Sequence, residues 1–155
     1  MLKEKIIVYT GGTFDMFHSN HVKMLEYARS LGDILIVGVS TDELVCSYKS
    51  PPTIPFEERI EIIKALKHPD IVVPQHSLDH SFLIKKLHVD AFVIGDDWLN
   101  KYDYLEKSGV KVFYFPYGMG VSSTKIKQQI TSNYTKIKSE VDKHINPDIK
   151  KSINS

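Results

Sequence analysis

Segments typical of β-strands alternate with segments typical of α-helices along most of this chain. Runs rich in β-branched and aromatic residues lie at 5–10, 33–40, 71–73, 91–94 and 110–115. Between them, apolar residues recur at helical spacing at 21–31, 56–67, 79–88 and 102–107. Alternation with short connections favours a parallel sheet with helices on both faces. We therefore predict an α/β fold built on a doubly wound parallel five-stranded sheet.

The C-terminal part of the chain has a different pattern. Six apolar residues spaced by three or four positions, from Ile126 to Ile145, predict one long helix that ends before Pro147. This stripe fits either a helix packed on its own domain or a helix that forms a dimer or docks a partner. We predict a domain over residues 1–131 and a C-terminal helical tail over 132–155.

Composition limits the possible partners. Twenty Lys and Arg residues face 19 Asp and Glu residues, for a formal net charge of +1. This balance argues against a nucleic-acid-binding protein that works through a large basic surface. A single cysteine, Cys46, rules out an intrachain disulfide and a multi-cysteine zinc cluster. No apolar run is long enough to cross a bilayer, and we expect a cytoplasmic protein.

The strongest motif is the segment GTFDMFHSNH at residues 12–21, which follows a predicted strand and opens a predicted helix. His18 and His21 are three positions apart and therefore lie near one face of that helix. A helix N-terminus favours an anion, and imidazole N–H groups there can stabilise charge on a transferring phosphoryl group. Alternatively, the two histidines cap the helix or bind a metal. We interpret a second pair, His76 and His80, as solvated residues at a helix end.

Four segments together resemble the signatures of cytidylyltransferases in the HxGH nucleotidyltransferase superfamily. GTFDMFHSNH is similar to GTFDxxHxGH, and STDE at 40–43 matches the family's STDE segment. GDDW at 95–98, with Lys101 and Asp103, resembles GDDWxxKxD of glycerol-3-phosphate cytidylyltransferases, and GVSSTKI at 120–126 resembles GISTTKI. The segments occur in the family's order over about residues 5–131. The resemblance implies a Rossmann-like nucleotidyltransferase fold.

The same resemblance implies an activity. The family transfers CMP from CTP to a phosphorylated small alcohol and releases pyrophosphate, and glycerol 3-phosphate is the acceptor that the GDDW segment favours. Mg²⁺ would accompany the triphosphate, and a homodimer is expected. Three alternatives remain: another acceptor such as phosphocholine, phosphoethanolamine or a sugar phosphate; ATP as the donor; or a nucleotide-binding protein without catalysis.

The resemblance also implies roles for individual residues. His18 and His21 would stabilise the α-phosphate and the leaving group, Arg59 would clamp the acceptor phosphate, and Lys49 would serve in catalysis or acceptor binding. A surface ion pair is the alternative for Arg59, and a turn carboxylate is the alternative for Asp15 as a ligand or orienter of Mg²⁺. No other protein-built metal site is predicted. The residues implied to bind nucleotide or acceptor are Gly12, Thr13, Phe14, Asp15, Asn20, Asp42, Lys67, Asp96, Tyr117, Gly120, Val121, Ser122, Ser123 and Thr124.

The chain departs from the family pattern at four positions. Asn20 stands where the family has glycine between the histidines, and Tyr117 stands where it has an arginine before the last motif. Tyr48 and Ser50 align with two family lysines, which leaves Lys49 as the basic residue of that loop. These changes remove positive charge where polyphosphate is expected, and they would alter the choice of nucleotide or acceptor or weaken activity.

Overall fold

The computed structural model describes residues 4–117 and 120–144 of the 155-residue chain. The chain divides into two compact units, Met1–Gly120 and Val121–Ser155, and we describe each by itself. Helix α5 (Ser123–His144) runs without interruption through residue 131. The domain boundary at that residue stays a prediction.

The first unit is built on a five-stranded parallel sheet, which confirms the predicted fold class. The strand order is β3-β2-β1-β4-β5. Tyr9 in the central strand lies opposite Ile36 on one side and Phe92 on the other. The strands are β1 (Ile7–Gly12), β2 (Ile34–Ser40), β3 (Ile71–Gln75), β4 (Ala91–Gly95) and β5 (Lys111–Phe115).

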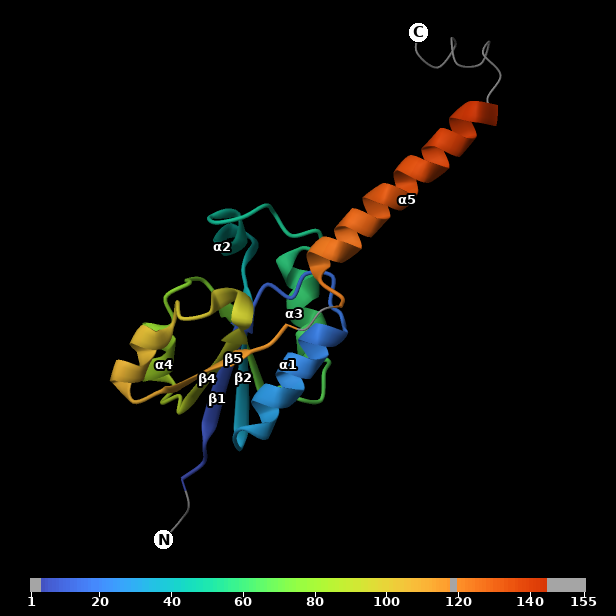
Figure 1. The fold of residues 1–155 in the computed structure, drawn as a ribbon. Coiled ribbons are helices and arrows are strands. Elements are labelled where there is room, and N and C mark those ends of the chain that lie inside the picture. The colour runs from blue at the N-terminus through green and yellow to red at the C-terminus, as the bar shows by residue number, and fades with distance from the viewer. Residues whose placement is uncertain (1–3, 118–119, 145–155) are drawn as a thin grey trace. The chain divides into compact units, whose positions relative to one another are not determined.

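Helices cover both faces of this sheet (Figure 1). Helices α1 (Ser19–Ser30) and α3 (Phe56–Lys64) pack on one face, and α4 (Ser81–Lys86) and the 3₁₀ helix η2 (Asp103–Ser108) pack on the other. Successive side chains of a strand point to opposite faces. Val8 therefore belongs to one buried core and Tyr9 to the other. Two separate apolar cores fix the sheet from both sides.

The strand order places a topological switch between β1 and β4. From β1 the chain runs through β2 to the edge strand β3, and it then returns to β4 on the other side of β1. The connections that leave β1 and β4 thus diverge onto opposite faces. In open α/β sheets, ligands bind beyond the carboxyl ends of the strands at such a point. The segments after β1 and β4 are therefore the ones positioned for function.

Several elements differ in extent from the sequence prediction. Strand β3 continues through Pro74, which we expected to end it, because β3 is an edge strand where a missing N–H is tolerated. A short helix, α2 (Asp42–Cys46), was not predicted. It begins after Thr41, whose hydroxyl accepts a hydrogen bond from the N–H of Leu44 (3.2 Å).

Two predicted helices differ from the prediction in their end point or their type. Helix α3 ends at Lys64 instead of Lys67. The helix predicted at 102–107 is the 3₁₀ helix η2, and it stops at Gly109, where φ is +84°. Glycine is the residue that adopts this left-handed conformation without strain.

The interpretation of His80 as a solvated residue was wrong. Its side chain is 1% exposed and packs against Tyr9, Phe92 and Tyr102, with ring centroids 5.7, 4.9 and 5.1 Å away. Its Nδ1 atom has no hydrogen-bond partner among the described residues. Helical spacing from His76 did not reveal this position, because His80 precedes α4 and turns into the core.

The second unit contains α5, which confirms the predicted long helix. Its apolar stripe includes Ile130, Tyr134 and Ile137, and Ile145 lies outside the described residues. Packing on its own domain and docking of a partner both stay predictions for this stripe. Within the described part of the chain, no helix combines the length and apolar character that a membrane crossing needs.

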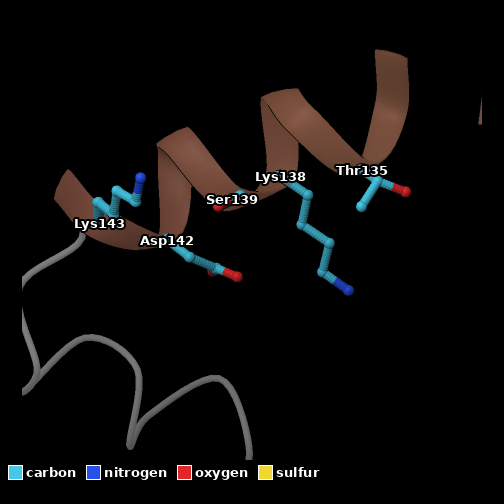
Figure 2. Close-up of a pocket in the computed structure, with 5 residues that line it drawn as sticks. All are labelled: Thr135, Lys138, Ser139, Asp142 and Lys143. Carbon is cyan, nitrogen blue, oxygen red and sulfur yellow. The ribbon is translucent and has the colours of Figure 1, made fainter. Parts of the chain in front are cut away.

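Figure 2 shows an open pocket along the C-terminal half of α5. All five of its lining side chains are polar and come from this one helix. None of them is a site residue predicted from the sequence, and no buried unpaired polar atom is found there among the described residues. The pocket carries no functional argument. Its lining residues are Thr135, Lys138, Ser139, Asp142 and Lys143.

Candidate active site

The turn between β1 and α1 has an unusual backbone. Phe14 and Met16 adopt positive φ angles of 55° and 49°, which are rare for residues with a side chain. The Phe14 ring is 2% exposed and packs into the core on the α1 side of the sheet. This anchor holds the turn in the left-handed conformation, and it brings the chain from Gly12 at the end of β1 into the first turn of α1. Strain of this kind gathers at functional sites.

His18 and His21 lie against each other at the start of α1. Their ring centroids are 3.8 Å apart and the rings are nearly parallel, at 22°. The main-chain N–H of His18 donates a hydrogen bond to Nδ1 of His21 (3.3 Å). An Nδ1 atom that accepts a hydrogen bond carries no proton, so the proton of a neutral His21 ring lies on Nε2. The fold thus makes His21 a hydrogen-bond donor through Nε2.

The surroundings keep both rings uncharged at neutral pH. Burial lowers the pKa of His21 to about 3, assisted by His18 and Lys49 and opposed by Asp15. Burial also lowers the pKa of His18. The Nδ1 atom of His18 is buried with no partner among the described residues. Two neutral imidazoles at a helix N-terminus are suited to donate hydrogen bonds to phosphate oxygens.

The Asp15 carboxylate ties the β1–α1 turn to the loop that precedes α3. Its Oδ2 accepts the N–H of Thr53 and its Oδ1 the N–H of Ile54, both at 2.9 Å. The side chain is 5% exposed. Of the two roles expected for Asp15, this geometry favours the structural carboxylate. No group of three or more histidine, cysteine or acidic side chains is arranged to hold a metal within the described ranges.

The Arg59 side chain is fully buried, and each of its three nitrogens donates a hydrogen bond within the protein. Nε donates to the carbonyl of Ile54 (2.8 Å), Nη1 to the carbonyl of Thr13, and Nη2 to Oδ1 of Asp42 (2.6 Å). The other oxygen of Asp42 accepts the N–H of Phe56 at the start of α3 (3.2 Å). We expected Arg59 to clamp an acceptor phosphate and Asp42 to bind nucleotide or acceptor. In the structure both side chains form a brace between the turn, the loop and α3, and their roles in binding acceptor or nucleotide stay predictions.

Lys49 lies just beyond α2, in a neighbourhood of aromatic rings. Its ammonium is 5.4 Å from the ring centre of Tyr48, and Tyr48 meets Trp98 edge-on at 5.9 Å. Lys49 is close enough to His21 and to Asp97 to perturb the pKa of each. The contact between Tyr48 and Trp98 brings the loop after α2 to the end of β4. Trp98 is half-buried there, which fits a wall of the site.

Asp97 was missing from the predicted site residues. The Asp97 side chain is exposed, and partial desolvation of its carboxylate raises its pKa, with Lys49 and Lys101 opposing that effect. Its position directly after a central strand, in the 3₁₀ helix η1 (Asp96–Trp98), is the signal that could have identified it. Phe17 was also missed: its ring stacks on His21 with centroids 5.3 Å apart and an angle of 24°.

Tyr117 reaches the site from the end of β5. Its main-chain N–H donates to Oδ1 of Asp96 (3.2 Å), and its ring meets the ring of His21 edge-on at 6.4 Å. Asn20 is half-buried in the first turn of α1. The structure therefore brings together residues from the ends of β1, β4 and β5 and from the loop after α2.

The remaining predicted residues lie elsewhere. Lys67 is exposed in the turn between α3 and β3, and α3 runs from the carboxyl edge of the sheet to the opposite edge, so within one chain Lys67 lies away from the histidines. Gly120 ends the first unit. In the second unit, the Ser122 hydroxyl accepts the N–H of Lys125 (3.1 Å) and caps α5. The nucleotide-binding roles of Val121, Ser122, Ser123 and Thr124 stay predictions.

Comparisons with known proteins found a matching family and several relatives. The model of the family described as cytidylyltransferase-like matches residues 9–129. The chain is 41% identical over 130 residues to the glycerol-3-phosphate cytidylyltransferase of Bacillus spizizenii, covering 83% of this chain and 98% of that protein. It is 36% identical to the enzyme of the same name from Staphylococcus aureus, covering 79% and 93%.

More distant similarities were also found. The chain is 35% identical to an ethanolamine-phosphate cytidylyltransferase of Dictyostelium discoideum, covering 80% of this chain and 36% of that protein. A solved structure of a lipopolysaccharide core biosynthesis protein from Thermoplasma volcanium superposes with a TM-score of 0.64 at 24% identity, covering 76% of this chain and all of that one. The solved structure supports the fold alone.

Proposed function

The chain belongs to the cytidylyltransferase-like family, a family of nucleotidyltransferases, and we propose that it transfers CMP from CTP to glycerol 3-phosphate or a closely related phosphorylated alcohol. The products are a CDP-alcohol and pyrophosphate. The observation that carries the proposal is the pair of stacked, neutral histidines at the N-terminus of α1, beside the topological switch of the sheet.

The proposed reaction is an in-line displacement. An oxygen of the acceptor phosphate forms a bond to the α-phosphorus of CTP, and the bond from that phosphorus to the bridging oxygen of the β-phosphate breaks. Pyrophosphate leaves with the electron pair. Such a transfer is accelerated mainly by positioning and by stabilisation of the charge on the phosphoryl oxygens.

Different residues of the first unit have different proposed roles in this reaction. His21 donates through Nε2 to an oxygen whose negative charge grows in the transition state, and His18 acts beside it. Lys49 neutralises the acceptor phosphate. Asp15 and Arg59 hold the loop that carries Lys49 against the β1–α1 turn, as their hydrogen bonds indicate.

The nucleotide is proposed to arrive as its Mg²⁺ complex. The Asp15 oxygens already accept two main-chain N–H groups, so Mg²⁺ would be held chiefly by phosphates and water and would supply positive charge to the triphosphate. Ser122, Ser123 and Thr124 are proposed to bind phosphate oxygens at the start of α5. We further propose that the enzyme works as a homodimer in the cytoplasm.

Pyrophosphate release tests the proposal. The purified chain is incubated with CTP, Mg²⁺ and, in parallel, glycerol 3-phosphate, phosphoethanolamine and phosphocholine. We expect turnover with glycerol 3-phosphate, and a loss of kcat on the order of a hundredfold to a thousandfold for His21→Ala, because a transition-state hydrogen-bond donor is removed.

The matched control is His76→Ala, an exposed histidine outside the site, which should leave kcat unchanged. Turnover with ATP in preference to CTP would contradict the assignment of the donor. Binding of CTP in a thermal-shift assay, with no pyrophosphate from any acceptor, would instead indicate a nucleotide-binding protein without catalysis.

A further inference from the structure

We propose that Tyr117 is a positioning residue for His21, and that its ring holds the imidazole by packing where the family motif has an arginine. The inference rests on the proposed function, because the position of His21 matters to turnover only if His21 acts on the phosphates. Three observations support it: how Tyr117 is anchored, the space made for its ring, and the set of neighbours around His21.

Tyr117 is anchored at both ends. Its main-chain N–H donates to Oδ1 of Asp96 at 3.2 Å, and its hydroxyl donates to the sulfur of Met24 at 3.4 Å. Met24 is 1% exposed and lies three residues after His21, so both side chains share one face of α1. A tyrosine whose hydroxyl reaches Met24 must therefore lie beside the imidazole.

The end of β4 leaves room for this ring. A Cβ atom on Gly95 would lie 2.1 Å from Cε2 of Tyr117 and 2.4 Å from Oδ1 of Asp97. Any side chain there would displace the tyrosine, so glycine at this position is needed for the ring to sit where it does. Phe115 supports the ring from β5, edge-on at 6.2 Å.

Tyr117 is the distant member of the aromatic surroundings of His21. Phe14, Phe17 and His18 come from the same turn and helix start, with ring centroids 5.4, 5.3 and 3.8 Å from that of His21. Among these neighbours, Tyr117 alone comes from a distant part of the chain, just beyond the end of β5. Its ring lies at 87° to the imidazole. It therefore couples the end of β5 to the orientation of the imidazole.

The ring acts by excluding water and not by supplying charge. Burial is the largest cause of the lowered pKa of His21, and burial also raises the pKa of the Tyr117 hydroxyl, which stays protonated as a donor. An arginine would add a positive charge beside the triphosphate, whereas tyrosine keeps the imidazole neutral by packing. The charged or titratable groups that act on His21 or on Tyr117 are Asp15, His18, Lys49, Asp96 and Asp97.

Two measurements on Tyr117→Ala test the proposal. NMR titration of the imidazole nitrogens in the free protein, assigned with a His21→Gln variant, should show the pKa of His21 rising by about one unit or more as water reaches the ring. The kinetic assay should show kcat falling on the order of tenfold to a hundredfold, with little change in KM for CTP, because positioning is lost and not binding.

Tyr117→Phe and Tyr117→Leu separate the parts of the effect. Phenylalanine keeps the ring, so Tyr117→Phe should leave the pKa of His21 and kcat close to those of the parent. Leucine keeps apolar volume without the ring edge, so Tyr117→Leu should give values between those of the parent and of Tyr117→Ala. The matched control is Tyr104→Ala, in η2, whose hydroxyl binds Asp79 and which should leave both measurements unchanged. If Tyr117→Ala does not fold, the leucine and phenylalanine variants decide the question.

An unchanged His21 titration in folded Tyr117→Ala or Tyr117→Leu would overturn the inference. So would a rise in KM for CTP with an unchanged pH profile, since that would make Tyr117 a nucleotide contact. Failure of the proposed function looks different: the parent protein would release no pyrophosphate from any acceptor, while the titration of His21 would still report on Tyr117.

Discussion

Replacing His80 by phenylalanine should make the folded protein less sensitive to acid. His80 is 1% exposed, and burial lowers its pKa to about 4, against the opposing effect of Asp79. In the unfolded chain the His80 ring has its ordinary pKa of 6.5 and binds a proton as the pH falls below that value. In the folded protein the ring stays neutral until the pH falls to its pKa of about 4. Stability from the neutral ring is therefore complete above 6.5 and is lost as the pH falls from 6.5 towards 4.

The size of the effect follows from these two values. Between pH 8 and pH 5 the unfolded chain gains most of one proton at this site and the folded protein gains almost none. Each pH unit across that window changes the free energy of unfolding by up to about 1.4 kcal/mol, so His80 contributes about 2 kcal/mol of destabilisation at pH 5. Phenylalanine cannot titrate and keeps an aromatic ring among Tyr9, Phe92 and Tyr102.

Urea denaturation at pH 8 and at pH 5 measures this contribution. The fall in the free energy of unfolding between the two pH values should be about 2 kcal/mol smaller for His80→Phe than for the parent. The control is His76→Phe, at an exposed position. Its free energy of unfolding should fall between the two pH values by as much as that of the parent. His21 titrates in the same direction, but it is present in all three proteins. Its contribution to the free energy of unfolding therefore cancels when the proteins are compared. Equal falls for the parent and His80→Phe would refute the reasoning.

Two further predictions concern residues that shape the site and the sheet. Arg59→Met should lower the free energy of unfolding by about 3 kcal/mol, since it leaves the carbonyls of Thr13 and Ile54 without their buried donor; a change below 1 kcal/mol in urea denaturation would argue against the brace. Gly38→Ala should destabilise by about 1–3 kcal/mol, because its Cβ would lie 1.9 Å from the buried Tyr9 hydroxyl. A thermal midpoint equal to that of the parent would contradict this expectation.

Much of the fold could be predicted because its signals are local. Runs of β-branched and aromatic residues predicted all five strands, helical spacing predicted the main helices, and short connections predicted a parallel sheet. The errors have local causes too. Pro74 remains inside β3 because that strand lies at an edge, and α2 is too short to show helical periodicity.

The site was predictable to the extent that it depends on order along the chain. His18 and His21 follow a strand and begin a helix, so their placement on one face at an anion-favouring terminus is contained in the sequence itself. The cap that Ser122 supplies to α5 is equally local.

Only the tertiary structure decided which side chains are engaged and which are buried. Arg59 and Asp42 look like ligand-binding residues in sequence, but their donors and acceptors are used between segments 17 to 46 residues apart. Tyr117 comes to His21, and His80 to Tyr9, only because the strand order 3-2-1-4-5 brings the ends of distant strands together. Periodicity reports the face of an element on which a residue lies, whereas burial and pairing depend on which elements are packed against that face.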